Sequence, residues 1–423
     1  MLVGHGRIDI TPKGKFYLLG YKTPLRNKPA KGIHDHVFIN GILFLNEKGE
    51  KCFIATGDLL EIEDIVAADI KMQISKKYDI PVEKIIIGVT HDHHSVRDYH
   101  RTWEFGQYSQ EYYEFFIDSF LKVYEQCLEN LAEVTVKYGQ DLILGYYGNR
   151  DHKGKLSDNV VSVIKFISDN KVVAGIVNMA VHSTVLGSNN MYLTADLAGN
   201  ICAQLKERWG IYPLMLIGCA GDSSNRFQRQ GRDFKELNRV SKGLAEKISQ
   251  IKSNKVVNVD KGNIQFLTLA QEIVNDKSKY DQSLHNKIKE MKEHSEHFVG
   301  LNNVNAVVEK CENQLKKPQF YDMLQMEILD IGELRIFIFP GELASAGAKF
   351  LRASTNKTVL IAGYSNGFHY YFMQAQDYGL SFESIGNPVP AGTFEKIISK
   401  FVHASHVLDS YERTEANEFR ITL

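Results

Sequence analysis

Hydrophobic residues along this 423-residue chain form short continuous runs, and several of these runs end directly in charged or potentially metal-binding side chains. The first such run covers residues 85–89, where four β-branched residues surround Gly88. A short apolar run rich in β-branched residues predicts a strand that is buried on both faces of a sheet. Comparable runs at 172–181, 212–218 and 334–340 predict further buried strands.

Amphipathic segments separate these strands. Apolar residues recur with helical spacing in 61–78 and 109–134, whereas 37–45 and 52–56 flank a Glu-Lys-Gly-Glu turn and predict a hairpin. Alternation of strands and helices predicts the α/β class, with mixed β-sheets flanked by helices. Because we find no repeats and no linker, the sequence favours a single domain over 1–423.

Composition changes between residues 272 and 317, where charged and polar residues dominate and apolar ones are widely spaced. This pattern predicts a helical hairpin inserted on the surface, with Gly300-Leu-Asn-Asn as its turn and a solvated charged face. A lid over a pocket is a second interpretation of the same segment.

A cluster of four polar residues follows the strand predicted at 85–89: His91, Asp92, His93 and His94. Alternate side chains of an extended segment point to the same side, so His91 and His93 are expected to project together. Neutral imidazole is the commonest protein ligand for zinc, which makes a metal site the first interpretation. A histidine general acid or base and a solvated loop are the alternatives.

Other polar side chains follow the remaining apolar strands. His182 follows 172–181, the Gly-Asp-Ser-Ser224 turn follows 212–218, and Glu342 follows the strand that ends in Pro-Gly. Proteins of the α/β class place their sites at strand ends, so these residues are candidates for one shared site. Arg150, in a Gly-Asn-Arg-Asp-His loop, is either a solvated charge or a member of that site.

Charge and cysteine usage limit the classes of partner. The 50 Lys and Arg residues balance the 51 Asp and Glu residues, so neither nucleic acid nor an anionic membrane is expected as the main partner. No apolar run is long enough to predict membrane insertion, and the N-terminus lacks a signal-peptide pattern. The five cysteines have no CxxC spacing and are expected to be free thiols of a reducing compartment, which favours a cytoplasmic protein.

Seven motifs, in order, resemble the neutral (non-lysosomal) ceramidase family, specifically its N-terminal catalytic domain, through about residue 400. The motifs are Gly32-Ile-His, Thr90-His91-Asp92-His93, Asn149-Arg150, His182-Ser-Thr, Gly221-Asp222-Ser223-Ser224, Pro340-Gly341-Glu342 and Gly363-Tyr-Ser-Asn. The family carries Thr-His-Thr-His at the second motif and Gly-Asp-Val-Ser at the fifth.

The resemblance implies a zinc ion and two catalytic residues beside it. The implied zinc ligands are His91, His182, Glu342 and Tyr371. The implied catalytic residues are His93, which would protonate the departing amine, and Arg150, which would stabilise the oxyanion. Ser224 matches a proposed nucleophile, and a zinc-bound water is the alternative attacker. The water is favoured, because zinc lowers the pKa of bound water to about 7.

Three departures from the family pattern alter the expected substrate. Phe382-Glu383 stands where the family has a Tyr-Glu pair, and Tyr378 is the candidate to replace the missing hydroxyl. His94 stands where the family has serine. The chain is also expected to lack the C-terminal immunoglobulin-like domain of ceramidases, which favours a soluble substrate over ceramide.

The sequence therefore predicts a zinc-dependent amidohydrolase that cleaves a linear amide (N-acyl) bond in a small soluble molecule. A ceramidase, another lipid amidase or an esterase is the alternative among enzymes. A non-catalytic metal-containing binding protein is the alternative from another class, and the sequence predicts no oligomeric state.

Overall fold

The computed structural model describes residues 1–423 except 22, 102–107, 261–262, 296–303 and 413–423. Its helices are α1 (Asp64–Tyr78), α2 (Gln110–Glu129), α3 (Asp196–Trp209), α4 (Phe234–Gln250), α5 (Lys277–Glu293), α6 (Val304–Leu315), α7 (Gly347–Ala353) and α8 (Thr393–Glu412). Short 3-10 turns connect some of the other elements.

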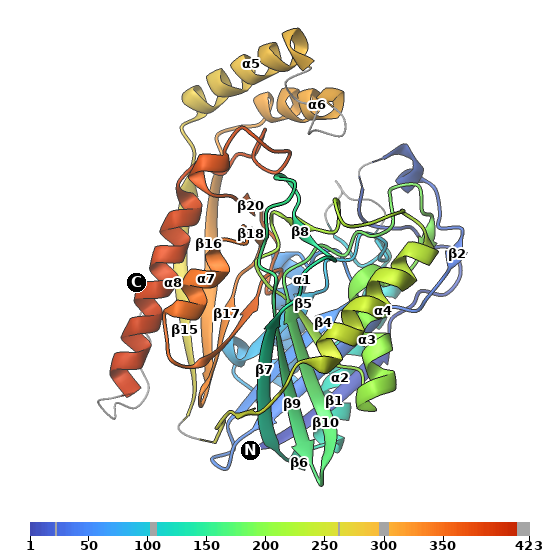
Figure 1. The fold of residues 1–423 in the computed structure, drawn as a ribbon, viewed down its shortest axis with the longest axis vertical. Coiled ribbons are helices and arrows are strands. Elements are labelled where there is room, and N and C mark those ends of the chain that lie inside the picture. Colours follow the sequence, from blue (N-terminus) through green and yellow to red (C-terminus); the bar gives the residue numbers. More distant parts are fainter. Residues whose placement is uncertain (22, 102–107, 261–262, 296–303, 413–423) are drawn as a thin grey trace.

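Three larger sheets form the centre of the molecule (Figure 1). The first sheet has the order β5 (Ile85–Val89), β4 (Lys51–Gly57), β3 (Phe38–Leu45), β1 (Leu2–Asp9) and β6 (Ala132–Glu133). The second has the order β12 (Leu214–Ile217), β10 (Lys171–Met179), β9 (Val160–Ser168), β7 (Thr135–Leu142) and β14 (Lys255–Val256). The third has the order β15 (Ile264–Val274), β16 (Tyr321–Ile331), β17 (Leu334–Ile338) and β19 (Thr358–Ala362).

Each of these sheets is mixed, which confirms the predicted α/β class. The pairs β4–β5, β10–β12 and β17–β19 are parallel, and the remaining pairs within the three sheets are antiparallel. Three two-stranded pairs complete the fold: β2 (Gly32–Ile33) with β11 (Tyr192–Leu193), β8 (Gly148–Asn149) with β13 (Ser223–Ser224), and β18 (Glu342–Leu343) with β20 (Tyr371–Phe372).

The inner faces of the three sheets pack into one shared core. Ile86 of β5 and Ile176 of β10 belong to this inner cluster, together with Ile336 of β17. The neighbours Ile85 and Ile87 belong instead to an outer cluster that includes residues of α1 and α2. Both faces of β5 are therefore buried, because the side chains of a strand alternate between its two faces. This is the arrangement that the apolar run at 85–89 predicts.

Helices cover the outer faces of the sheets. Residues of α3 and α4 share a cluster with outward residues of β9 and β10, and residues of α7 and α8 pack on the outer face of the third sheet. In Figure 1, α7 and α8 lie on one side of the molecule and α2, α3 and α4 on the other. The sheets and helices together surround the strand ends with packed core on several sides.

Two predicted helix boundaries are wrong. The helix predicted over 109–134 ends at Glu129, because Ala132 and Glu133 leave the helix to pair with β1. The helix predicted over 61–78 begins only at Asp64. The predicted start at Ser109 is correct to within one residue, since Ser109 caps α2 and its side chain accepts a hydrogen bond from the Tyr112 amide.

The segment 272–317 contains α5 and α6, which lie at the top of the view in Figure 1, beyond the ends of β15 and β16. The two helices share a small core with Ile385, formed by Leu284, Ile288, Met291, Val307, Val308 and Cys311. The predicted turn at Gly300 lies outside the described residues. Its role as an insertion or lid stays a prediction.

Among the described residues, no helix is both long and apolar enough to cross a membrane. The five cysteines are buried and free, as the absence of CxxC spacing predicts.

Candidate metal centre

The carboxyl ends of several strands meet at one place in the molecule. An isolated parallel bridge joins Asp92, beyond β5, to Ser183, beyond β10. A second bridge joins Gly88 of β5 to Ser365, and the Gly363 amide donates to the Ile217 carbonyl at the end of β12. The residues that follow β5, β10, β12 and β19 therefore converge, although they are far apart in the sequence.

Three histidines lie together at this convergence. Ring nitrogens of His91, His93 and His182 all lie within 4.8 Å of one another, and the Nε2 atoms of His91 and His93 are 3.2 Å apart. His91 has a positive φ of 55°, so His91 and His93 meet through a turn rather than through the strand extension that the sequence predicts. The predicted proximity of the two rings is nevertheless correct.

Backbone carbonyls determine the tautomers of two of these rings. His91 Nδ1 lies 2.8 Å from the Leu60 carbonyl oxygen, and His182 Nδ1 lies 3.1 Å from that of Ser223. A carbonyl can only accept a hydrogen bond, so both Nδ1 atoms carry hydrogen. Burial lowers the pKa of His91 to about 3 and lowers the pKa of His182 in the same direction. Both rings are therefore neutral, and each presents a lone pair at Nε2.

Both Nε2 atoms lie beside the carboxylate of Glu342. Its Oε2 lies 3.0 Å from His182 Nε2 and 3.6 Å from His91 Nε2. His182 Nε2 is buried without a hydrogen-bond partner among the described residues. A buried carboxylate beside two imidazole nitrogens that carry no hydrogen is stabilised by a cation that all three groups share. These residues therefore fit a metal ion, since neutral imidazole and carboxylate are the donors that such an ion requires.

Two tyrosines surround the same carboxylate. The Tyr364 hydroxyl donates to Glu342 Oε2 at 3.2 Å, and Tyr371 is the direct partner of Glu342 in the β18–β20 ladder. Burial raises the pKa of Glu342, while the Arg150 charge and hydrogen bonds from both tyrosines oppose that rise. The family resemblance implies Tyr371 as a ligand and gives no role to Tyr364, even though Tyr364 belongs to the Gly-Tyr-Ser-Asn motif.

Arg150 reaches the site from the pair of β8 with β13. Its Nη2 forms a 2.7 Å ion pair with Glu383 Oε1 and donates at 2.8 Å to the Gly221 carbonyl. Burial alone would lower the pKa of Arg150, but Glu383 and Tyr371 raise it well above its ordinary value. The guanidinium is therefore charged, with its carbon 5.4 Å from the centre of the Tyr371 ring. Glu383 is a residue that the sequence analysis missed, although the Phe-Glu pair marks its position.

The remaining candidate residues make other contacts. Ser224 is buried, and its Oγ accepts a hydrogen bond from the Arg226 amide at 3.1 Å. The Tyr378 hydroxyl donates to the Val389 carbonyl at 2.8 Å, so its proton is bound to backbone. Phe382 is 44% exposed and does not bury its ring in the site.

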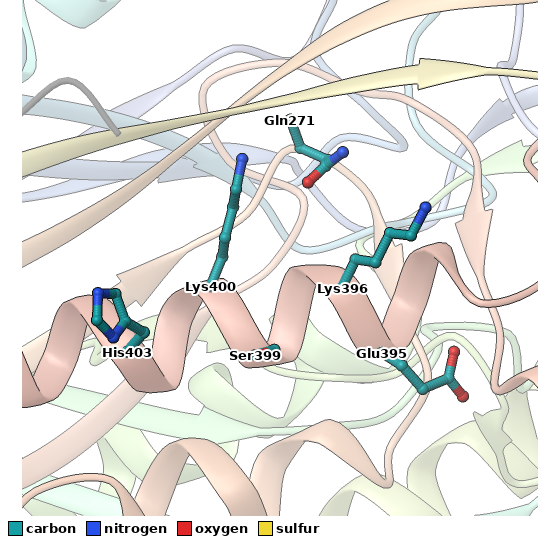
Figure 2. Close-up of a pocket in the computed structure, with 6 residues that line it drawn as sticks. All are labelled: Gln271, Glu395, Lys396, Ser399, Lys400 and His403. Atoms are coloured by element: carbon teal, nitrogen blue, oxygen red, sulfur yellow. The ribbon is translucent and has the colours of Figure 1, made fainter.

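A separate surface groove of about 610 Å³ lies between α8 and β15. Figure 2 shows its lining residues, which are Gln271, Glu395, Lys396, Ser399, Lys400 and His403. None of the predicted site residues is among them.

The fold and the strand-end site define a chain with the architecture of ceramidases, and the predicted resemblance is confirmed at the level of the fold. A structure described as a ceramidase complexed with C2 has a TM-score of 0.75 and 16% sequence identity, over 100% of this chain and 77% of that chain. A neutral ceramidase from Pseudomonas aeruginosa has a TM-score of 0.74 and 17% identity, over 100% of this chain and 76% of that chain. No protein-family model matches the chain, and no curated protein sequence matches it.

Proposed function

We propose that the chain is a zinc-dependent amidohydrolase that cleaves a linear amide bond in a small acylated molecule. The observation that carries this proposal is the convergence of two imidazole Nε2 atoms, from His91 and His182, beside the carboxylate of Glu342. A zinc ion held there would polarise the acyl carbonyl and lower the pKa of a water molecule to about 7.

The residues that would hold the ion are His91, His182, Glu342 and Tyr371. Two neutral imidazoles with oxygen donors suit zinc better than magnesium or calcium, which prefer oxygen ligands throughout. Tyr364 would orient the carboxylate through its hydrogen bond to Glu342 Oε2.

Arg150 supplies a fixed positive charge beside these ligands. Glu383 and the Gly221 carbonyl occupy its Nη2 and hold the guanidinium in place, while its Nε is buried without a hydrogen-bond partner among the described residues. In amide hydrolysis, negative charge develops on the acyl oxygen as water adds to the carbonyl. A charged guanidinium at this place would stabilise that oxygen more strongly than the ground-state carbonyl.

His93 is the group placed to move a proton. Burial lowers the pKa of His93 well below its ordinary value, and its Nδ1 is buried without a partner among the described residues. The ring therefore rests neutral, accepts a proton from the attacking water and then donates it to the departing amine.

Ser224 is less suited than water to be the nucleophile. A serine hydroxyl requires a neighbouring base to accept its proton. Ser224 Oγ accepts a hydrogen bond from the Arg226 amide, and an amide N–H is a donor that cannot take the hydroxyl proton. We therefore favour water as the attacking group.

The proposed substrate is small because the ligand groups are deeply buried. His91, His182 and Glu342 are 2%, 0% and 3% exposed, while His93 is only half-buried. Ceramide is the second candidate substrate, since both similar structures are described as ceramidases.

The test combines metal analysis with substrate comparison. Purified protein is expected to contain zinc and to release amine from short N-acyl amines faster than from ceramide. It is also expected to hydrolyse amides at least as well as matched esters. Faster hydrolysis of ceramide would make ceramide the preferred substrate. Faster hydrolysis of the ester would make the chain an esterase.

Two site variants and one control complete the test. His182→Ala and Glu342→Gln are expected to lose zinc and activity together, whereas His403→Ala, on the exposed face of α8, is expected to keep both. Metal-loaded wild type that turns over no acyl substrate would contradict the enzyme proposal and favour a binding protein.

A further inference from the structure

A second group of potential metal ligands lies behind the histidine cluster. Asp92 and His94 alternate with His91 and His93 along the loop that follows β5, and Asp196 is the first residue of α3. One ligand atom from each of Asp92, His94 and Asp196 lies within 4.8 Å of the others. All three side chains are fully buried, each with an exposure of 0%.

The hydrogen-bonding of His94 leaves one ring nitrogen without a partner. Its Nε2 lies 3.2 Å from the Gly187 carbonyl oxygen, which can only accept, so Nε2 carries the hydrogen in a neutral ring. Its Nδ1 faces Asp196 Oδ2 at 3.2 Å, and this contact is not a hydrogen bond. A cation that both groups share would compensate a buried imidazole nitrogen and a buried carboxylate oxygen that lie this close without a hydrogen bond.

Asp92 presents a second unpaired atom to the same place. Its Oδ1 accepts a hydrogen bond from the His94 amide at 2.9 Å, whereas its Oδ2 is buried without a hydrogen-bond partner among the described residues. Arg26 attracts this carboxylate electrostatically, but none of its three guanidinium nitrogens forms a hydrogen bond within the described part of the chain. A second proton on His94 would not form a hydrogen bond to Asp196 in this geometry, and it would leave Asp92 Oδ2 unpaired.

Asp196 is held so that it can serve as the third ligand. Its Oδ1 accepts from the Val185 amide at 3.1 Å and its Oδ2 from the Leu186 amide at 3.3 Å. These bonds orient the carboxylate and leave lone pairs on both oxygens, since each carboxylate oxygen has more than one acceptor site.

We propose that Asp92, His94 and Asp196 bind a second divalent transition-metal ion, separate from the ion at His91 and His182. Two carboxylates and one imidazole suit Zn²⁺ or Mn²⁺ better than Mg²⁺ or Ca²⁺, because magnesium and calcium prefer oxygen ligands alone. The ion ties the loop that bears His91 and His93 to the N-terminus of α3, and so acts as a structural support for the first site. This inference does not depend on the reaction proposed for the first site.

The experiment counts metal in the full chain by mass spectrometry after loading with Zn²⁺ and removal of excess metal by dialysis. Wild type is expected to hold about two equivalents per chain, and His182→Ala and Asp92→Asn about one each. Asp98→Asn, which changes a buried aspartate of the same loop outside the cluster, is expected to hold about two. The proposal would be overturned if wild type held about one equivalent of zinc per chain and Asp92→Asn held the same amount.

A spectroscopic measurement covers the case in which Asp92→Asn fails to fold. Cobalt-loaded His182→Ala is expected to keep an absorption spectrum of cobalt bound by one nitrogen and several oxygens. Absence of bound cobalt in folded His182→Ala would overturn the second site. If His182→Ala bound cobalt but wild type held no second equivalent of metal, the first site would be contradicted instead. The two proposals can therefore fail separately.

Discussion

At the scale of single residues, backbone carbonyls control the chemistry of the candidate metal centre. The carbonyl oxygens of Leu60 and Ser223 place hydrogen on the Nδ1 atoms of His91 and His182. Each of these rings then carries its lone pair on Nε2, which is the nitrogen available to bind a metal ion. Such a partner for the second nitrogen is typical of metal-ligating histidine, because it fixes the tautomer and the ring orientation.

Replacing Arg150 by lysine tests whether the shape of the guanidinium group matters as well as its charge. Arg150→Lys keeps a positive charge but loses the rigid planar fork, in which one nitrogen pairs with Glu383 while another donates in a different fixed direction. We expect kcat to fall by about 10²-fold with KM little changed, since the lost stabilisation belongs to the transition state. Steady-state kinetics on an N-acyl amine measures this split.

Arg150→Ala is the companion variant, and added guanidinium ion is expected to restore part of its activity. A rise in KM with unchanged kcat for Arg150→Lys would assign Arg150 to substrate binding rather than to oxyanion stabilisation. Unchanged zinc content in both variants is the control that separates this effect from loss of the metal.

At the scale of elements, short ladders deliver the site residues. The parallel pairing of β18 with β20 sets Glu342 opposite Tyr371, and the pairing of β8 with β13 brings Arg150 beside the Asp222–Ser224 turn. Each of these strands has two residues, so none could be predicted from periodicity. They form because the larger sheets bring their flanking chains together.

The segment between Tyr364 and Tyr371 is fastened by His369. His369 Nδ1 lies 2.6 Å from Asp322 Oδ2 of β16, and its Nε2 lies 3.2 Å from Asp64 Oδ2 at the start of α1. Burial alone would lower the pKa of His369, but hydrogen bonds to Asp322 and Asp64 raise it from 6.5 to about 9. The charged ring therefore connects the tyrosine segment to two separate elements.

The raised pKa of His369 predicts a pH dependence of stability. The stabilisation is fully present below the unfolded pKa of 6.5 and is lost as pH rises through about 9. Relative to wild type, His369→Gln is expected to unfold with on the order of 1 to 3 kcal/mol less free energy at pH 6, and with a smaller difference at pH 10. Urea unfolding at the two pH values measures the change.

Asp322→Asn serves as the matched variant for this prediction, because it removes the charge of one partner and keeps the shape. Asp322→Asn is expected to weaken the stabilisation by the charged His369 ring, so that the free energy of unfolding depends less on pH than in wild type. A gap between wild type and His369→Gln that is the same at both pH values would show that the ring acts by packing rather than by its charge.

At the scale of the whole molecule, one buried amide joins the second and third sheets. Asn178 of β10 donates to the carbonyls of Leu216 at 2.9 Å and Ile361 at 2.8 Å, and accepts from the Ile361 amide at 2.9 Å. The bond to Leu216 lies within the second sheet, whereas the two bonds to Ile361 cross to the third sheet just beneath the strand ends that bear the site.

Asn178→Ala is expected to destabilise the fold by about 2–4 kcal/mol, because it leaves several buried backbone groups unpaired. Chemical denaturation measures this change. Ser162→Ala, which alters a buried polar residue of the adjacent strand β9, is the control and is expected to cost less. Equal losses in the two variants would mean that the inter-sheet bonds contribute no more than ordinary burial.

Metal removal is expected to lower the stability of the entire fold. The proposed ligands come from the ends of different sheets, so a bound ion would link those sheets in the folded state only. Stabilisation grows with RT ln(1 + [L]/Kd), which is about 2.7 kcal/mol when free zinc is 100-fold above Kd. A chelator should therefore lower Tm measurably, and added zinc should restore it; a Tm indifferent to both would contradict a shared metal.

Local pattern alone determined that apolar runs at 85–89, 172–181 and 334–340 become buried strands and that histidines or a carboxylate follow them. Those features are predictable because burial on both faces of a strand requires a continuous apolar run, whatever the strand packs against. The tertiary structure alone decided that Tyr364 and Glu383 join the site and which nitrogen of each histidine is free. It also brought Asp196 beside Asp92. These features depend on partners distant in the chain, and no periodicity in a single segment records which distant segment will lie beside it.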